Sequence, residues 1–379
     1  MQRSSWRSPM LAAATVGALI GVARAEPAAM STPVEIAARL PVPLGNVTIT
    51  PDGRTVVSHH PMFETAARVS EVTSPTTLKP FPNEAWNTPR SGAEDYLDGV
   101  LGLRSDSEGT VWMLDMGTRT GITPKLVAWD TRQDRLARII PLSEPATRRN
   151  SEPNDFVIDE PNQRIYITDE GVGRGGDGSA AALIVVDLKA GRARRVLEGH
   201  ASTRPEDVPI TVDGRILVKQ QKDGNSASMR SGADGVTLDH RSEWLYYGPL
   251  NGGAVYRLRV ADLLDERLDP GELGRRVERY ADRPNAGGIA IDRDDNLYLT
   301  EIENRAIGII PAKDRRYRRF ATHPDMLWPD GFGAGADGWI YVTVTQLALA
   351  ATLNGGKDGS APPFLLARFK PLADGKVGQ

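Results

Sequence analysis

Apolar and polar residues alternate in short stretches along most of the chain, and turns of Gly, Asp or Asn separate these stretches. One unit recurs six times: a polar residue, an alternating apolar stretch, a tight turn, and a second strand rich in Tyr, Trp and Val. Alternation with a period of two is typical of a strand, and Gly, Asp and Asn supply the positive φ angles that hairpin turns need. The predicted hairpins begin near Asn46, Asp98, Asn154, Asp234, Asn285 and Asp330.

The spacing of these hairpins predicts a closed propeller. The steps between successive starts are about 52, 56, 80, 51 and 45 residues, a range typical of propeller blades. A further strand pair follows most hairpins, for example near residues 125 and 182. We therefore predict an all-β fold, a six-bladed β-propeller with four-stranded antiparallel blades. The long step leaves room for an insertion over 200–232.

The two ends of the predicted propeller have different patterns. After the sixth hairpin only 364–370 reads as a strand, so we expect Val34–Leu40 to add the missing outer strand and close the last blade. Such closure removes the open edges that promote aggregation. The final seven residues, ADGKVGQ, have no apolar pattern and are predicted to be dispensable. One helical pattern over 260–280 is interrupted at Pro270 and is expected in a loop.

The N-terminus has the pattern of a secretory signal. Arg3 and Arg7 precede an apolar run over 10–22, and the tripeptide ARA at 23–25 fits the small-x-small cleavage rule. The run of about 13 residues is short for a membrane span. We therefore predict a signal peptide at 1–25 and a single secreted or periplasmic propeller domain at 26–379, with no membrane contact after cleavage.

Charge and composition narrow the classes of partner. The formal net charge is −3, and cleavage would remove three arginines and no acids, which leaves about −6. This charge, together with the lack of any basic run, argues against nucleic acid as a partner. The chain has no cysteine, so it has neither disulfides nor thiol chemistry. The expected protein is a monomer with a small-molecule ligand.

Propeller geometry directs attention to one face of the predicted fold. The innermost strand of each blade lines the channel and the second strand returns antiparallel, so first-strand starts and second-strand ends open on the same face. The second-strand ends are His59, His60, Asp115, Asp169, Glu170, Asn251, Glu301, Asn304 and Gln346. The predicted ligand-channel residues are Asn46, Asp98, Asn285, Asp330, His59, Glu301, Trp328 and Phe332.

These residues also have structural interpretations. Asp and Asn at strand starts often cap turns through their own backbone. Trp328 and Phe332 flank Asp330, where they would either pack between blades or stack on an aromatic or sugar ligand. Successive strand residues point to opposite faces, so at most one of His59 and His60 faces the channel. Several carboxylates and carboxamides at one mouth would suit a hard cation such as Ca²⁺.

A glycine-rich loop matches a nucleotide-binding spacing. Gly171, Gly173 and Gly176 fit G-x-G-x-x-G. A dinucleotide fingerprint needs a helix after this loop, whereas the following SAAALIVVDL reads as a strand. We therefore interpret the segment as a blade loop and predict no nucleotide cofactor.

Several longer motifs occur in a fixed order. They are TLKPFPNEAWN, GTVWMLDMG, TPKLVAWDTRQDRLARIIPL, NDFVID with IYITDEG, WLYYGPL and LWPDGF. Together they resemble the yellow/major royal jelly protein family over nearly all of the mature chain. The resemblance implies a propeller that binds a small molecule, such as an aromatic amine, in its channel. The cysteines that animal members carry around the second blade are absent here.

The predicted architecture is also similar to the gluconolactonase/senescence-marker propellers. Those proteins hold a divalent ion at the channel mouth with Glu, Asn and Asp side chains and hydrolyse sugar lactones. The similarity implies Asn154 and Asp234 as ligands of one divalent cation (Ca, Mg, Mn or Zn), with Asp234 also as the catalytic base. Asn46 stands where that family has Glu. Small-molecule binding, a metal-dependent lactonase and a protein-binding scaffold therefore all remain open.

Overall fold

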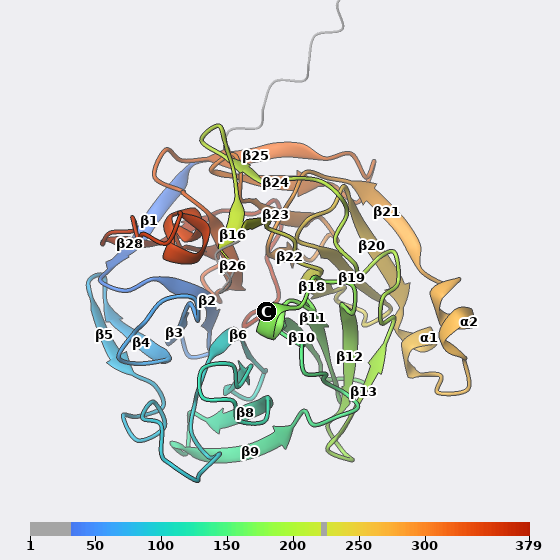
Figure 1. Ribbon diagram of the computed structural model, residues 1–379, viewed down its shortest axis with the longest axis horizontal. Coiled ribbons are helices and arrows are strands. Elements are labelled where there is room, and N and C mark those ends of the chain that lie inside the picture. Colours follow the sequence, from blue (N-terminus) through green and yellow to red (C-terminus); the bar gives the residue numbers. More distant parts are fainter. Residues whose placement is uncertain (1–31, 221–225) are drawn as a thin grey trace, which may run out of the picture.

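The computed structural model describes residues 32–220 and 226–379, so the predicted signal peptide at 1–25 lies outside the described residues. Six four-stranded antiparallel sheets surround a central channel (Figure 1). The short alternating stretches form the strands, and the turns of Gly, Asp and Asn separate them. The predicted six-bladed β-propeller is therefore confirmed.

In each blade the strands are ordered from the channel outward. Blade 1 contains β2 (Leu44–Ile49), β3 (Thr55–His59), β4 (Val69–Ser74) and β5 (Thr77–Pro80). Blade 2 contains β6 (Val100–Ser105), β7 (Thr110–Asp115), β8 (Lys125–Asp130) and β9 (Arg135–Pro141). Blade 3 contains β10 (Pro153–Asp159), β11 (Arg164–Asp169), β12 (Ala182–Asp187) and β13 (Arg192–Val196).

The remaining blades follow the same order. Blade 4 contains β18 (Ala233–Leu238), β19 (Trp244–Pro249), β20 (Ala254–Arg259) and β21 (Glu278–Asp282). Blade 5 contains β22 (Ile289–Ile291), β23 (Leu297–Glu301), β24 (Ala306–Ile310) and β25 (Arg318–Thr322). Blade 6 contains β26 (Pro329–Ala334), β27 (Ile340–Val344), β28 (Phe364–Phe369) and β1 (Val34–Leu40).

The N-terminal strand closes the propeller, as predicted. Strand β1 pairs antiparallel with β28 from Val34 opposite Phe369 to Leu40 opposite Phe364. Pairing at the outer edge joins the two ends of the chain in one sheet, so the ring of blades is held shut by backbone hydrogen bonds.

Apolar side chains pack between neighbouring blades. Trp112 and Leu114 of blade 2 belong to one buried cluster with Phe156 and Ile158 of blade 3. Each fully buried side chain of this size contributes about 1.5–3 kcal/mol through the hydrophobic effect. These clusters hold the blades at fixed angles and so fix the geometry of the channel.

Outside the blades, the chain forms an insertion and a pair of turns. Between blades 3 and 4, β14 (Thr211–Val212) pairs with β15 (Arg215–Ile216), and β16 (Val218–Gln220) pairs with β17 (Ser226–Ser228). This β14–β17 insertion is the one that the long step predicted. After β27, the chain forms two 3₁₀ turns, η2 (Leu347–Leu349) and η3 (Ala351–Leu353).

The helical pattern over 260–280 forms two short helices in the connection between β20 and β21. They are α1 (Val260–Leu264) and α2 (Pro270–Gly274). Pro270 follows the cap residue Asp269, whose carboxylate accepts a 2.8 Å hydrogen bond from the Glu272 amide. Proline therefore starts the second helix rather than interrupting one long helix.

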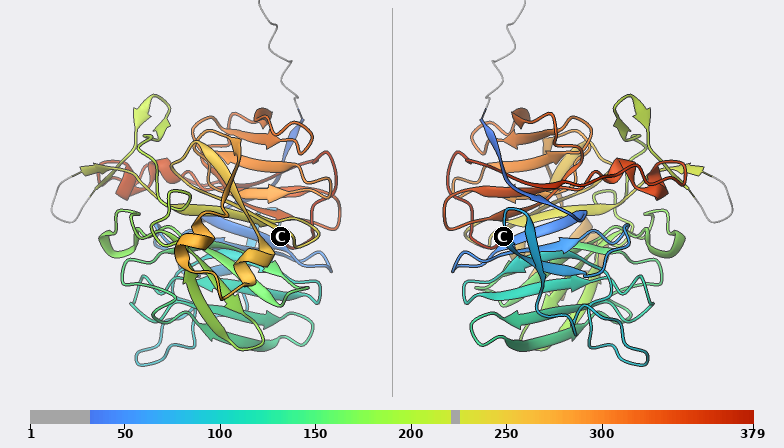
Figure 2. Two further views of the ribbon diagram at one scale, coloured as in Figure 1. Left: turned by 90° about the vertical axis from the view of Figure 1, so that its right-hand side faces the viewer. Right: turned by 90° about the vertical axis from the view of Figure 1, so that its left-hand side faces the viewer.

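The final residues close the channel on one face. The mark for the C-terminus lies at the centre of the propeller (Figure 1), on the side away from the β14–β17 insertion (Figure 2). The carbonyl of Gly378 accepts hydrogen bonds from Ser105 (2.9 Å) and Thr48 (3.1 Å). The Gln379 side chain accepts from the amide of Ile158 (3.1 Å) and donates to the carbonyl of Ser105 (3.2 Å).

We call residues 371–379 the tail. Through Thr48, Ser105, Ile158 and the isolated bridge of Gly375 with Asp292, the tail contacts the far ends of the inner strands of several blades. These contacts argue against the expectation that the final residues are dispensable. They need no apolar pattern because they are bound through backbone groups and the polar side chains of Lys376 and Gln379.

Candidate functional site

A cavity of about 250 Å³ lies at the channel mouth opposite the tail. Its wall comes from the starts of inner strands, the ends of second strands, the β14–β17 insertion and the turns after β27. Its charged and polar residues are His60, Thr118, Glu152, Asn154, Glu170, Lys219, Arg230, Ser231, Asp234, Asp330 and Thr352, and Arg230 is paired with Asp207. We call this the mouth cavity.

Asn154, Asp234 and Asp330 occupy equivalent positions in blades 3, 4 and 6. Each directly follows the first paired residue of its inner strand, at a bulge that shifts the register of the ladder. A bulge redirects the side chains beside it, and all three of these side chains line the mouth cavity. The equivalent residues in blades 1 and 2 are Gly45 and Leu101, so the acidic side is built by blades 3, 4 and 6.

The residues that follow the second strands form another part of the cavity wall. Their last paired residues in blades 1 and 3 are His59 and Asp169, and the residues that follow, His60 and Glu170, line the cavity. Because side chains alternate along a strand, the residue before each of them points away from the channel. The prediction that at most one of His59 and His60 faces the channel agrees with this arrangement, and His60 is the one.

Glu170 and Asp234 form the centre of the acidic group. Burial raises the pKa of Glu170 well above its usual value; repulsion by Asp234 and Glu152 adds to this, and a hydrogen bond with Asn154 opposes it. Burial likewise raises the pKa of Asp234, with repulsion by Asp330 as the next contribution. The group therefore binds protons more strongly than free carboxylates do.

Asp330 lies across the cavity beside His60. Burial raises the pKa of Asp330 to about 7, although a hydrogen bond from Thr345 opposes the shift. The Nε2 atom of His60 lies 3.9 Å from the Asp330 carboxylate, and burial lowers the pKa of His60 to about 3. The imidazole is therefore neutral and does not compensate the carboxylate. Among the described residues, no Lys or Arg forms an ion pair with Glu152, Glu170, Asp234 or Asp330.

Apolar residues also line the cavity. Trp328, Met62, Met116 and Leu250 line it, and Trp328 is only 1% exposed. The backbone of Trp328 has φ 62°, a left-handed conformation that is unusual for a bulky residue and is found where a site needs it. Aromatic and sulfur-containing side chains beside acidic ones favour a ligand with an apolar body and a positive end.

Two segments that cover the mouth are tied together by one arginine. The Arg215 guanidinium of the insertion donates 2.8 Å hydrogen bonds to the carbonyls of Leu353 and Ala348. Leu217 and Met229 of the insertion belong to the same buried cluster as these turns and Trp328. This cluster excludes water from the mouth and so explains the burial of the carboxyl groups beneath it.

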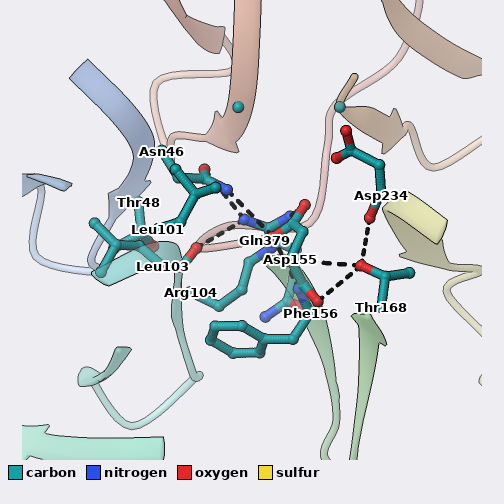
Figure 3. Close-up of polar contacts among 12 residues, drawn as sticks. Asn46, Thr48, Leu101, Leu103, Arg104, Asp155, Phe156, Thr168, Asp234 and Gln379 are labelled. Carbon is teal, nitrogen blue, oxygen red and sulfur yellow. Dashed lines mark hydrogen bonds and ion pairs between the residues drawn. The ribbon is translucent and has the colours of Figure 1, made fainter. Parts of the chain in front are cut away.

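Below the mouth cavity the channel is filled by a compensated charge pair (Figure 3). The Arg104 guanidinium lies 2.8 Å from the Asp155 carboxylate, and both residues are almost fully buried. Asn46 donates to Asp155 (3.2 Å) and accepts from Arg104 (3.3 Å). We call Asn46, Arg104 and Asp155 the lower channel. It separates the mouth cavity from the tail.

Glycine leaves room for this packing. In the other four blades the position equivalent to Asn46 and Asp155 is Gly102, Gly235, Gly288 or Gly331. A Cβ on Gly331 would lie 2.5 Å from the Asn46 side chain. Side chains at this level are therefore limited to two blades, which are the two that hold the charge pair.

Three predicted first-strand residues do not line the mouth cavity. Asn46 lies one residue beyond the equivalent position and belongs to the lower channel. Asp98 precedes β6, and its carboxylate accepts from the amides of Arg119 (2.7 Å) and Thr120 (3.1 Å), so it caps a loop. Asn285 precedes β22, donates to the Pro209 carbonyl (3.1 Å) and accepts from the Gly252 amide (3.1 Å). The bulge shifts the register, which the sequence pattern does not show.

Three further predicted residues also point away from the cavity. The ring nitrogens of buried His59 have no hydrogen-bond partner within the described residues, and burial lowers its pKa to about 4. Glu301 bonds Asn304 (2.9 Å) and Arg319 (3.1 Å) inside blade 5. Phe332 packs between blades. Trp328, Asn154, Asp234 and Asp330 do line the cavity.

Glu152 and Lys219 line the cavity although the sequence did not single them out. Glu152 lies two residues before Asn154, so the period of a strand could have placed both side chains on one face. Lys219 lies in the insertion, and no pattern in the sequence links it to the channel. Burial raises the pKa of Glu152.

The oxygen donors of Asn154, Glu170 and Asp234 are of the kind that bind hard cations. However, no group of three or more His, Cys, Asp or Glu side chains in the described part of the chain is arranged to hold a metal ion. Within 32–220 and 226–379, no helix has both the length and the apolar character needed to cross a membrane.

Comparisons with known proteins agree on the fold. A family model described as major royal jelly protein matches residues 99–330, which is more than half of the chain. No curated protein matches the chain. Among solved structures, a Xanthomonas campestris gluconolactonase is 12% identical, with a TM-score of 0.55 over 92% of this chain and 99% of that one.

Other solved structures are similar to the same degree. A luciferin-regenerating enzyme is 11% identical, with a TM-score of 0.52 over 92% of this chain and 100% of that one. A streptogramin B lyase is 14% identical, with a TM-score of 0.51 over 91% of this chain and 99% of that one. At such low identity these similarities support the propeller fold alone, because one fold supports many activities.

Proposed function

The chain belongs to the major royal jelly protein family, and from this premise we propose that its mouth cavity binds a small organic cation such as a protonated amine. One observation supports this proposal above others. Glu170, Asp234 and Asp330 face one cavity, and no Lys or Arg among the described residues forms an ion pair with them. Buried carboxyl groups need a cationic partner if they are to be charged, and a cationic ligand would supply it.

The apolar wall defines the rest of the ligand. Trp328 offers an aromatic face, on which an organic cation or an aromatic ring would stack. Met62 and Met116 adapt their shape to different apolar groups. The volume of about 250 Å³ favours a small molecule over a polymer.

The raised pKa values lead to a second observable that can be measured, the release of protons on binding. Without ligand, burial disfavours the charged forms of Glu170 and Asp234 and so raises their affinity for protons. A bound cation favours the charged forms, so binding should release protons. A neutral ligand of the same shape would release none.

Titration calorimetry with phenethylamine and the neutral 2-phenylethanol tests this function. We expect only the amine to bind, with a heat that differs between two buffers of different ionisation enthalpy. Asp234→Asn should lower the affinity for the amine by at least about tenfold, because it removes one charge from the group. Glu84→Gln, at an exposed carboxylate outside the mouth cavity, is the matched control. Equal affinity for amine and alcohol would exclude the proposal.

A metal-dependent lactonase is the second candidate, and one observation favours it. Asn154 and Asp234 hold equivalent positions in neighbouring blades, and Glu170 interacts with both. The lack of a three-residue acidic or histidine arrangement argues against a preformed site. Calorimetric titration with Ca²⁺, Mg²⁺, Mn²⁺ and Zn²⁺ separates the candidates: tight, stoichiometric uptake of one ion, lost in Asp234→Asn, favours the lactonase.

We also propose that the protein acts outside the cytoplasm, on the basis of the signal pattern at 1–25. N-terminal sequencing of exported protein should give a start near Glu26. Recovery of exported protein with Met1 intact would contradict this part of the proposal.

A further inference from the structure

A second hollow lies beside the mouth cavity. It has a volume of about 350 Å³ and is lined by the loop after β7 and the segment between β9 and β10. Met116 and Thr118 line both hollows and so form a wall that the two share. A ligand that extends over this wall would touch both hollows.

The glycine-rich loop at 171–176 also connects the two hollows. Glu170 and Val172 line the mouth cavity, whereas Arg174 lines the second hollow. Arg174 has φ 49°, a left-handed conformation that is uncommon for a residue other than glycine. A Cβ on Gly121, in the opposite wall, would lie 3.3 Å from the Arg174 guanidinium, so this side chain extends across the hollow.

The second hollow has the opposite charge to the mouth cavity. Arg148, Arg149 and Arg174 line it, and Glu144 is the only carboxylate in its lining. Arg148 is paired with Glu198 at 3.1 Å. Within the described part of the chain, neither Arg149 nor Arg174 forms an ion pair with Asp or Glu. Two arginines without a carboxylate partner in one hollow suit a carboxylate or phosphate group.

We propose that the second hollow is an anion subsite of the mouth cavity, and that the ligand is a zwitterion with an ammonium group at one end and a carboxylate or phosphate at the other. This inference rests on the proposed function, because it needs the ammonium group in the mouth cavity. The ammonium lies among Glu170, Asp234 and Asp330, the ligand crosses Met116 and Thr118, and its anionic group meets Arg149 and Arg174. The acidic mouth cavity thus binds the ammonium end of the molecule, and the basic second hollow binds its anionic end.

The test compares ω-amino carboxylates of increasing chain length, from glycine to 8-aminooctanoate, with n-alkylamines of the same carbon number. Calorimetry should show one chain length at which the amino carboxylate binds at least about tenfold more tightly than its alkylamine. O-phosphoethanolamine beside ethanolamine distinguishes a phosphate from a carboxylate preference. Arg149→Gln and Arg174→Gln should each reduce the ratio of the two affinities by about threefold to tenfold.

Arg132→Gln is the matched control, because this exposed arginine pairs with Glu108 outside the lining of both hollows. It should leave both affinities unchanged. If amines bind but no amino carboxylate binds more tightly, the anion subsite is wrong while the proposed function stands. If neither class binds, the proposed function fails as well. A ratio that both arginine variants leave unchanged would also overturn the subsite.

Discussion

The mouth cavity and the lower channel both contain buried carboxyl groups, yet they differ in how the charge is compensated. Asp155 lies 2.8 Å from Arg104 and accepts a further hydrogen bond from Asn46. Asp234 and Glu170 form no ion pair with Lys or Arg among the described residues, although Arg283 and Lys219 attract them from a greater distance. Burial raises the pKa of all three carboxyl groups, including Asp155. The lower channel therefore contains its own counter-charge, whereas in the mouth cavity the proposed cationic ligand would supply it.

The largest expected effect breaks the compensated side of this comparison. Arg104→Met leaves Asp155 buried without its cation and should lower the free energy of unfolding by about 3–5 kcal/mol. The double variant Arg104→Met with Asp155→Asn should recover at least half of this loss, since no charge remains unpaired. Denaturant unfolding of both variants measures the effect. Equal losses in the single and double variants would show that packing, not charge, dominates there.

A somewhat smaller effect concerns the tail below the lower channel. Deletion of residues 373–379 removes the hydrogen bonds of Gly378 and Gln379 with Ser105, Thr48 and Ile158. At about 1 kcal/mol for each lost hydrogen bond, the free energy of unfolding should fall by about 2–4 kcal/mol. Changing Lys370→Ala, outside the tail, is the control. If the truncated protein has the same melting temperature as the wild type, the tail is dispensable for stability.

The smallest expected effect sharpens the description of the mouth. The pKa of Asp330 is raised to about 7, so the folded state holds a proton that the unfolded chain loses near pH 4. The stabilisation that comes from the raised pKa of Asp330 is fully present below pH 4 and is lost as the pH rises to 7. Relative to Asp330→Asn, the wild type should therefore lose stability over this window, by at most about 4 kcal/mol and by less to the extent that water enters the mouth.

Melting curves of both proteins from pH 4 to 8 measure that difference. The comparison removes the opposite contribution of His60, whose pKa is lowered to about 3, because both proteins contain it. Parallel curves would mean that Asp330 titrates in the folded protein as it does in water. More water would then reach the mouth cavity than the burial of Asp330 implies.

Most of the fold could be predicted because it depends on local patterns. Alternation and turn residues located the six hairpins, and the lack of a fourth strand after 364–370 pointed to Val34–Leu40, which is β1. The tail escaped prediction because backbone hydrogen bonds leave no trace in an apolar pattern. Lys219 also escaped prediction, because no pattern in the sequence shows that the insertion brings this residue to the mouth cavity.

The site could be predicted only in part because its geometry depends on register. Asn154, Asp234 and Asp330 line the cavity, whereas Asn46 lies one residue further and belongs to the lower channel. A shift of one residue moves a side chain to another face, and the bulge that sets the register is not visible in the residue types. Asp98 was placed in the channel for the same reason and caps a loop instead.

The pairing of β1 with β28 also sets when the protein can finish folding. Residue Val34 leaves the ribosome early, but its partner Phe369 follows only after nearly the whole chain. At about 5–20 residues per second this wait lasts on the order of tens of seconds. Glu35 and Arg39 place charges on the exposed face of β1, which is a common way to protect an unpaired strand from association. The ring of blades can therefore close only when synthesis is nearly complete.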